Sequence, residues 1–328
     1  MNKFFDFTLR GLRCVYRKCR KTSTVVMLPC ERDANKAGEI IYNQLILDKP
    51  CMISRFGTTE ISALVNYLGI IAQKRSVWKY ISGKQLEWWW NEGDRYRMTN
   101  NSGFFPATDK NLFKFGQRMM QDIPLIDILG SWQKNEYYFA SYFPSASLIR
   151  LELLDPYWSD KPWTRCLEGK KVLVVHPFAE IIEDQYKTKR ELLFNNKAIL
   201  PLFELKTVKA VQSLGGNTND FKDWFEALSF MEEEIDKQDY DICLLGCGAY
   251  GLPLAAHVKR KGKKAVHIGG TLQLLFGIWG ARWENPQYGA QLFGTDRLYT
   301  TLLNEHWVRP GEEYRPSNYK DVDKGCYW

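Results

Sequence analysis

Short apolar runs alternate along the chain with longer stretches in which apolar residues recur every three to four positions. The short runs predict buried strands, and the periodic stretches predict helices. Strands that alternate with helices are typical of a parallel sheet covered by helices, so the predicted fold class is α/β, with a Rossmann-like, mostly parallel sheet. Strands are predicted at 50–55, 123–129, 171–178, 203–208, 242–245 and 265–270, and helices at 34–47, 59–68, 111–120, 187–194, 221–236, 252–261 and 271–283.

The clearest unit is a strand, a tight turn, a helix and a second strand between residues 241 and 270. Gly246, Gly248 and Gly251 follow the first apolar run with Gly-x-Gly-x-x-Gly spacing, and Tyr250 lies among them. Backbone N–H groups of such a turn can approach a phosphate, and the following helix adds the positive end of its dipole. The spacing favours a nucleotide or diphosphate ligand. Glycines needed only for a tight turn and close helix packing are the alternative.

A dinucleotide site also requires an acidic residue about twenty positions further on, where it holds a ribose hydroxyl. That place is occupied by His267, Gly269 and Gly270. An NAD-dependent oxidoreductase is therefore disfavoured. Gly269 and Gly270 instead form a second glycine turn that is predicted to contact the nucleotide.

Two further strand ends carry polar residues. Arg55 ends one predicted strand, and Gly57, Thr58, Thr59 and Glu60 follow it at the start of a helix that Thr58 or Thr59 can cap. Ligands of open α/β sheets bind at the carboxyl ends of strands, so these residues are candidates for binding and catalysis. A salt bridge between Arg55 and Glu60, with Glu60 complementing the helix dipole, is the alternative.

His176 stands at the end of the strongest predicted strand. A histidine there can hydrogen-bond a phosphate or act as an acid or base near neutral pH. A structural histidine bonded to a loop carbonyl is equally compatible with the pattern.

Positive charge is concentrated at the N-terminal end. Residues 1–22 hold seven bases and one acid, so this end carries +6 of the net charge of +7, and a broad nucleic-acid groove is not expected. Phe5, Leu9, Leu12 and Tyr16 share one helical stripe, which can lie in the interface of an anionic membrane. A solvated basic arm is the alternative. The predicted organisation is an arm over 1–35 and a single α/β domain over 36–328 with an irregular aromatic C-terminal segment.

The predicted location is the cytoplasm, peripheral on the inner face of the cytoplasmic membrane. The eight cysteines form no Cys-x-x-Cys pair, the four histidines have no zinc-ligand spacing, and no apolar segment is long enough to span a bilayer. Three consecutive tryptophans at 88–90 predict an aromatic surface that is exposed or shared with a partner.

Several segments together resemble the GT-D-type glycosyltransferases and related proteins of bacterial surface-polysaccharide biosynthesis. The resemblance extends from about residue 40 to the C-terminus. The residues that carry it are Arg55-Phe-Gly-Thr-Thr-Glu60, Val174-Val-His-Pro-Phe178, Gly246-Cys-Gly-Ala-Tyr-Gly-Leu-Pro253, Ile268-Gly-Gly-Thr-Leu-Gln273, Gly280-Ala-Arg-Trp283 and Gly325-Cys-Tyr-Trp328.

The resemblance implies transfer of a sugar from a nucleotide-sugar donor, such as a UDP-sugar, to a surface-glycan acceptor that can be lipid-linked. It implies catalytic roles for Arg55, Glu60 and His176. The family's Asp-x-Glu motif serves binding of Mg²⁺ or Mn²⁺ and of the donor, but Thr58 replaces its Asp here, which leaves Glu60 as the motif's metal ligand. This departure, with the tryptophan surface, makes a non-catalytic nucleotide-sugar-binding or assembly subunit the second hypothesis.

Overall fold

The computed structural model describes residues 3–20, 25–216, 220–293, 298–316, 318–322 and 325–328. Its centre is a sheet of seven strands, all parallel, in the order β3-β2-β1-β7-β6-β4-β5. The strands are Cys51–Arg55 (β1), Ile128–Ser131 (β2), Ser147–Arg150 (β3), Lys171–His176 (β4), Glu204–Lys209 (β5), Ile242–Leu245 (β6) and Lys264–His267 (β7). This sheet, flanked by helices, confirms the predicted α/β class.

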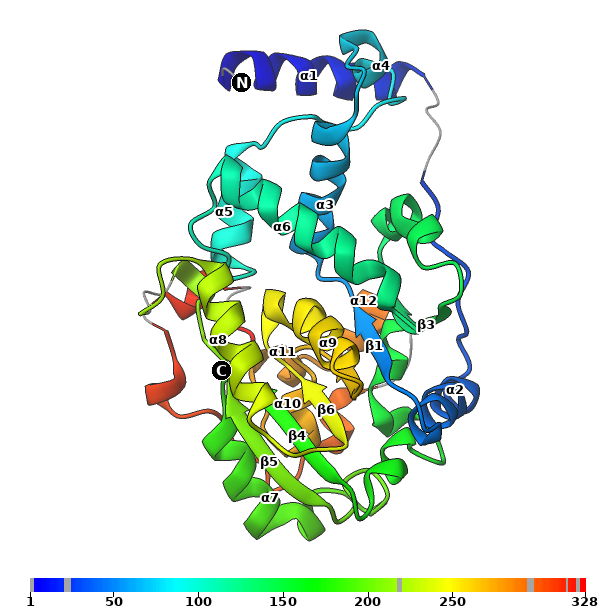
Figure 1. The fold of residues 1–328 in the computed structure, drawn as a ribbon, viewed down its shortest axis with the longest axis vertical. Helices are drawn as coiled ribbons and strands as arrows, with labels where there is room; N and C mark the ends of the chain where they lie inside the picture. Colours follow the sequence, from blue (N-terminus) through cyan, green and yellow to red (C-terminus); the bar gives the residue numbers. More distant parts are fainter. Residues whose placement is uncertain (1–2, 21–24, 217–219, 294–297, 317, 323–324) are drawn as a thin grey trace.

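Helices cover both faces of the sheet (Figure 1). The helices are Lys3–Cys19 (α1), Ala34–Ile46 (α2), Thr58–Ile71 (α3), Val77–Ile81 (α4), Glu92–Asn100 (α5), Asp109–Asp122 (α6), Ala179–Leu193 (α7), Trp224–Asp236 (α8), Gly251–Arg260 (α9), Leu272–Leu275 (α10), Ala281–Glu284 (α11) and Tyr288–Phe293 (α12). A 3₁₀ segment, η2, spans Lys134–Tyr142, and a shorter one, η7, spans Gly248–Tyr250.

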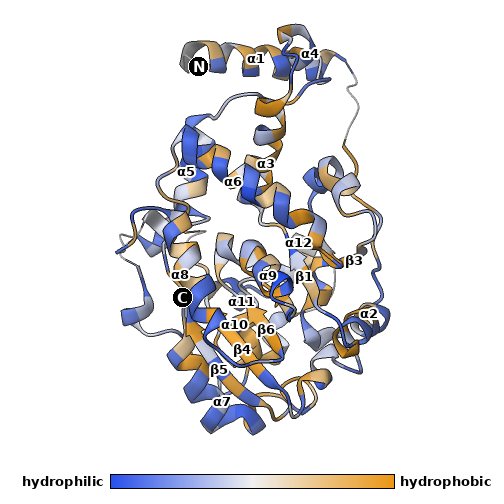
Figure 2. Ribbon diagram, in the orientation of Figure 1, coloured by the Kyte–Doolittle hydropathy of each residue, from blue (hydrophilic) through white to orange (hydrophobic). Residues whose placement is uncertain are grey.

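Strand side chains alternate between two separate cores. In β4, Leu173 and Val175 pack with α3, α6, α8 and α9, whereas Val172 and Val174 pack on the opposite face with α2, α7 and α10. Strands buried on both faces are nearly continuously apolar, which explains the unbroken Val-Leu-Val-Val run. In Figure 2 the central strands β4 and β6 are accordingly orange, while the outer helix α7 is largely blue.

Several predicted elements differ from the structure. The strand expected at 123–129 begins only at Ile128, after a 3₁₀ turn, and β3 and the helices α4 and α5 were not predicted. The helix expected at 187–194 begins at Ala179. The single helix expected at 271–283 is two short ones, because Gly277 adopts a left-handed φ of 66° and Gly280 is extended. A Cβ at Gly280 would lie 2.5 Å from the backbone of Tyr327.

The N-terminal helix packs on its own chain. In Figure 1, α3 leads from the sheet to α4 and α1 at the top of the view. Leu9 is buried with Tyr80 and Trp89, and the Trp89 indole N–H donates to Asp6 at 2.8 Å. Trp89 is thus covered by α1, which contradicts a fully solvated arm, while Trp90 packs against the core that contains α3 and α6. Residues 1–2 and 21–24 of the predicted arm lie outside the described residues. No helix in the described ranges is long and apolar enough to cross a membrane.

Candidate functional site

A pocket of about 480 Å³ lies at the carboxyl ends of the four central strands β1, β7, β6 and β4. The chain continues from β4 to β5 on one side and from β6 to β7 on the other, so the strand order reverses between β4 and β6. Such a switch point is where open α/β sheets bind ligands. The structure brings eleven of the twelve predicted site residues into the lining of this pocket: Arg55, Gly57, Thr58, Thr59, Glu60, His176, Gly246, Gly248, Tyr250, Gly269 and Gly270.

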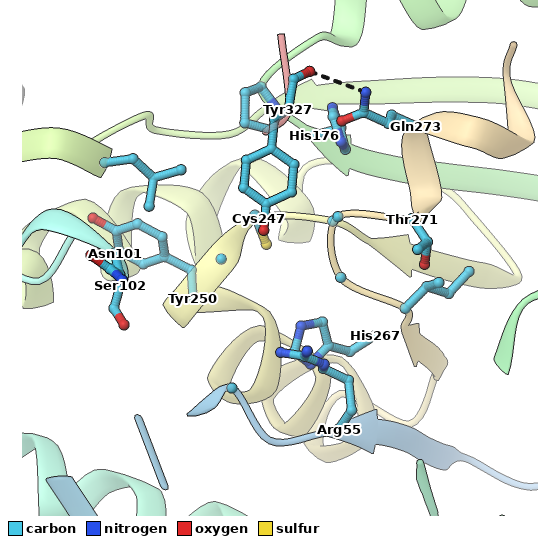
Figure 3. Close-up of a pocket in the computed structure, with 18 of the residues that line it drawn as sticks. Arg55, Asn101, Ser102, His176, Cys247, Tyr250, His267, Thr271, Gln273 and Tyr327 are labelled. Atoms are coloured by element: carbon cyan, nitrogen blue, oxygen red, sulfur yellow. Dashed lines mark hydrogen bonds between the residues drawn. The ribbon is translucent and has the colours of Figure 1, made fainter. Parts of the chain in front are cut away.

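Both glycine turns are fixed by close packing around the pocket. A Cβ at Gly246 would lie 2.6 Å from the His176 ring and 3.0 Å from the Gly269 carbonyl oxygen. Gly248 and Gly269 adopt left-handed φ values of 56° and 86°, which disfavour other residues. A side chain at Gly270 would meet the Tyr327 ring, which Figure 3 shows extending into the pocket. The turns thereby bring their backbone to the pocket wall, although the N–H groups of Gly246 and Gly269 themselves donate to the Val175 and Leu245 carbonyls.

Gly251 is the predicted site residue that does not line the pocket. It begins α9, and a Cβ there would lie 2.2 Å from Nε2 of the buried His267. The third glycine of the motif allows the His267 ring to pack under the helix. Its predicted nucleotide contact is corrected to this packing role.

We expect Gly251→Ala to lower the free energy of unfolding by about 1–3 kcal/mol, because an added methyl group overpacks a buried site. Chemical denaturation measures this loss. Gly11→Ala is the matched control, since nothing lies within 4 Å of a Cβ at that position in α1. The control should be neutral or slightly stabilising because alanine favours the helix. Equal stability of the two variants would contradict the packing role.

Arg55 is a pocket cation that can bind a ligand. Its guanidinium carbon lies 5.3 Å from the centre of the Trp132 ring, and its Nε is buried without a hydrogen-bond partner. No carboxylate of the described residues forms an ion pair with it, so the predicted salt bridge to Glu60 is absent from the described part of the chain. Figure 3 shows Arg55 beside His267 at the pocket wall. The arrangement leaves guanidinium N–H groups for an anion.

Glu60 lies in the first turn of α3, with its carboxylate folded against Gly57. A Cβ at Gly57 would lie only 1.8 Å from Glu60 Oε2. Gly57, rather than Thr58 or Thr59, is the N-cap of α3, and no side chain caps this helix. The Thr58 hydroxyl instead accepts a hydrogen bond of 2.7 Å from the Gln133 amide. The position of Glu60 favours complementing the helix dipole over reaching an acceptor.

His176 is suited to donate a hydrogen bond. It is 3% exposed, and its Nδ1 accepts the Phe178 backbone N–H at 3.0 Å. The proton of the neutral ring therefore resides on Nε2. Burial lowers the pKa of His176 to about 3, so the ring stays neutral at physiological pH. This environment argues against the predicted acid–base role and leaves the hydrogen-bonding role.

Tyr250 supports the pocket from behind. Its ring stacks on Trp224 at 5.0 Å, and its hydroxyl lies 3.0 Å from the Ser213 hydroxyl, which in turn donates to the Gly103 carbonyl. Neighbouring Asn101 and Ser102 line the pocket on the same side (Figure 3). The Tyr250 hydroxyl is thus hydrogen-bonded to the loop that contains Ser213, which is bonded in turn to the loop that contains Gly103. Tyr250 therefore has a structural role in the site.

Asp155 is a pocket residue that sequence reasoning missed. It is 5% exposed and accepts a 2.6 Å hydrogen bond from the Tyr299 hydroxyl. Burial raises the pKa of Asp155 to about 7, and hydrogen bonding from Tyr299 and Thr271 opposes only part of this shift. A carboxyl group with a pKa near 7 can exchange a proton at physiological pH. Asp155 is therefore suited to proton transfer in the pocket.

The donor atoms around Glu60 fit a protein-held metal ion poorly. In the described ranges, no three His, Cys, Asp or Glu side chains gather where they could hold a metal. Mg²⁺ and Mn²⁺ prefer several oxygen ligands, of which this motif supplies one carboxylate and the Thr58 hydroxyl. Metal ligation by Glu60 stays a prediction, and no step of the proposed reaction depends on it.

Comparisons of the chain with protein-family models, curated proteins and solved structures found no match.

Proposed function

We propose that the protein is a glycosyltransferase that uses a nucleotide-sugar donor. The observation that carries this proposal is the convergence of Arg55, two glycine turns and the uncapped start of α3 at one pocket. Cationic side chains and free backbone N–H groups at a helix start are the groups that bind a diphosphate. The pocket volume of about 480 Å³ is within the ordinary range for small-molecule sites.

The segments that carry the family resemblance also meet at this pocket. Residues from all six of them line it, including Arg282, Tyr327 and Trp328 from the C-terminal part of the chain. The two C-terminal segments, 280–283 and 325–328, make this meeting informative, since they end no strand and the class of sheet does not bring them to the pocket. The convergence supports the transferase proposal.

In the proposed reaction the acceptor hydroxyl oxygen forms a bond to the anomeric carbon while the bond from that carbon to the diphosphate breaks. The hydroxyl proton passes to the Asp155 carboxylate. The leaving nucleotide diphosphate takes the bonding electrons, and Arg55, the backbone N–H groups and the His176 Nε2–H stabilise its charge. Arg55 and Asp155 are thus assigned to the leaving group and the acceptor, respectively.

The acceptor we propose is a bacterial surface glycan, free or lipid-linked, with the protein at the inner face of the membrane. A nucleotide-sugar-binding subunit without transfer activity is the second candidate. Thr58 in place of the family's carboxylate favours it, because a metal-dependent transferase would lose a ligand there. The two candidates share donor binding and differ in turnover.

Donor binding can be tested by thermal shift. A nucleotide sugar that binds only the folded protein should raise Tm, with a stabilisation of about 2.7 kcal/mol at a ligand concentration one hundred times Kd. We expect a shift with at least one UDP-sugar and none with NAD. Failure of every nucleotide sugar and nucleoside diphosphate to shift Tm would contradict both candidates.

The same assay tests the metal. Thr58→Asp restores the family's carboxylate beside Glu60, so we expect Mn²⁺ to strengthen donor binding in this variant more than in the wild type. Thr58→Asn is the matched control, because it adds an amide of similar size without the charge. An equal Mn²⁺ response in the wild type and both variants would argue against a metal site at Glu60.

A further inference from the structure

A second cavity, of about 550 Å³, lies between α1 and the body of the protein. We call it the basic cleft. One wall is α1, and the other comes from α3, α4, η2 and the segment before α5. Its lining residues are Arg10, Arg13, Cys14, Arg17, Lys18, Val65, Asn66, Tyr80, Leu86, Glu87, Asn135 and Tyr138.

The cleft carries a surplus of positive charge, with four bases and one acid in its lining. Arg10 is neutralised by Asp6 and Glu87. Arg13 lies 4.4 Å above the Tyr80 ring, and its buried Nε has no hydrogen-bond partner. No acidic side chain in the described part of the chain forms an ion pair with Arg17 or Lys18. The cleft thus holds cations whose charge the protein does not balance.

Exposed apolar side chains lie next to these cations. On α1, Phe7 is 79% and Val15 60% exposed, and on α4 Trp78 is 65% exposed. The Trp78 ring meets Tyr16 of α1 edge-on at 5.7 Å, so the two helices present one surface. Solvent-exposed aromatic and aliphatic side chains beside bases are typical of helices that lie in a membrane interface.

We propose that the basic cleft binds the phosphate head group of an anionic membrane lipid, while Phe7, Val15 and Trp78 enter the lipid interface. Arg13, Arg17 and Lys18 would contact the phosphate, and Asn135 and Tyr138 on the facing wall would add hydrogen bonds. This differs from adsorption of α1 on a charged surface, because the phosphate enters between two walls. A membrane lipid has a phosphate for the cleft and acyl chains for the apolar surface beside it. A soluble anion has only the first of these.

The cleft and the pocket share one wall, which is α3. Thr58 at the start of α3 lines the pocket, and Asn66 of the same helix lines the cleft. Eight residues of helix separate them, a rise of about 12 Å. This step alone rests on the proposed function: a lipid-linked acceptor whose phosphate occupies the cleft would have its glycan on the side of the pocket.

The test is co-sedimentation of the full chain with phosphatidylcholine vesicles, with and without phosphatidylglycerol. Arg17→Gln and Asn135→Asp change opposite walls of the cleft, and each should weaken binding to the anionic vesicles about tenfold or more through a lost or opposed charge-assisted contact. Arg20→Gln is the matched control, since Arg20 follows α1, is exposed and lies outside the cleft. It should weaken binding by no more than about fivefold.

Three outcomes would overturn the proposal: no preference for anionic vesicles, equal losses for Arg17→Gln and Arg20→Gln with no loss for Asn135→Asp, or release by inorganic phosphate at constant ionic strength. The second would indicate surface adsorption, and the third a soluble phosphate ligand. Thermal melting of each variant verifies its folding. The assay involves no sugar, so its failure leaves the transferase proposal standing, and failure of donor binding leaves the lipid site standing.

Discussion

Replacing Asp155 by Asn is expected to lower sugar transfer by roughly 10²- to 10⁴-fold, because the amide cannot take the proton of the acceptor hydroxyl. Asn keeps the size of the side chain and one oxygen to accept the Tyr299 hydrogen bond. Donor affinity should change little, since Arg55 and the glycine turns are untouched. Turnover with a UDP-sugar, measured beside donor affinity by thermal shift, separates these two effects.

Glu60→Gln is the matched control, because it removes a carboxylate charge from the same pocket. Glu60 lies against Gly57 at the start of α3, so its loss should cost at most about 1 kcal/mol of stability and leave turnover intact. If Glu60→Gln abolishes transfer and Asp155→Asn does not, Glu60 is the base and our assignment is wrong. If neither variant transfers less sugar than the wild type, neither Asp155 nor Glu60 acts as base.

The pH dependence gives a second check on Asp155. Its carboxyl group is protonated in the folded protein below a pKa of about 7 and is deprotonated above it. Because a general base acts in its deprotonated form, turnover should rise with pH through about 7 and then level off. The raised pKa also means that the wild type loses stability as pH rises from the usual Asp value toward 7. The amide introduced by D155N is uncharged at every pH, so this variant should show neither effect.

Most of the candidate site could be predicted because it occupies the ends of strands that are unmistakable in the sequence. The apolar runs before Arg55, His176 and Gly246 are buried on both faces of the sheet, and parallel strands bring their carboxyl ends to one edge. Once these strands were predicted, their end residues had to meet. The shared pocket therefore follows from the class of sheet.

Asp155 was missed because its strand was missed. β3 is an edge strand of four residues, of which only Ile149 is fully buried, so it lacks the apolar run of the central strands. Glu152 and Asp155 lie shortly after the carboxyl end of β3, as His176 lies at the carboxyl end of β4, but no apolar run in the sequence marks β3. A short edge strand is specified by its pairing with β2, which no local pattern reveals.

Gly251 and α1 show a different limit. The Gly-x-Gly-x-x-Gly spacing indicates three positions that exclude side chains. It does not indicate whether a phosphate or a histidine ring occupies the space beside each glycine. Likewise, the stripe of α1 indicates that one face of the helix is apolar, but it does not indicate what covers that face. In the structure Leu9 on that face is covered by Tyr80 and Trp89 from another part of the chain. In both cases a tertiary contact decides between functions that share one local pattern.

The histidines and arginines that line the pocket differ in their charge and in their partners. His176 and His267 are neutral at physiological pH, because the pKa of each is lowered to about 3, by burial for His176 and by burial together with the charge of Arg55 for His267. Arg97 also lines the pocket, but Asp94 pairs with it. Arg282 lines the pocket as well, where it contacts the Cys326 thiol and the Tyr327 ring. Arg55, whose Nε is buried without a hydrogen-bond partner, is the cation that we expect to bind the diphosphate.

Replacing Arg55 by Gln is therefore expected to weaken binding of a nucleoside diphosphate by roughly 10- to 150-fold, the effect of losing one charged hydrogen-bonding group. Binding of the corresponding nucleoside, which lacks phosphates, should be nearly unchanged. Calorimetric titration of UDP and uridine into the wild type and R55Q measures both. Turnover should fall further, because negative charge grows on the leaving diphosphate as the bond breaks.

Arg97→Gln is the control for Arg55→Gln, since it removes the same charge from the same pocket at a side chain already paired with Asp94. We expect it to weaken UDP binding by clearly less. Removing Arg55 should also raise the pKa of Asp155, because the guanidinium charge favours the ionised carboxylate. The rise of turnover with pH should consequently move to higher pH in R55Q and stay in place in R97Q. Equal losses of UDP and uridine binding in R55Q, with an unmoved pH profile, would mean that Arg55 maintains the shape of the pocket through Trp132 and does not bind phosphate.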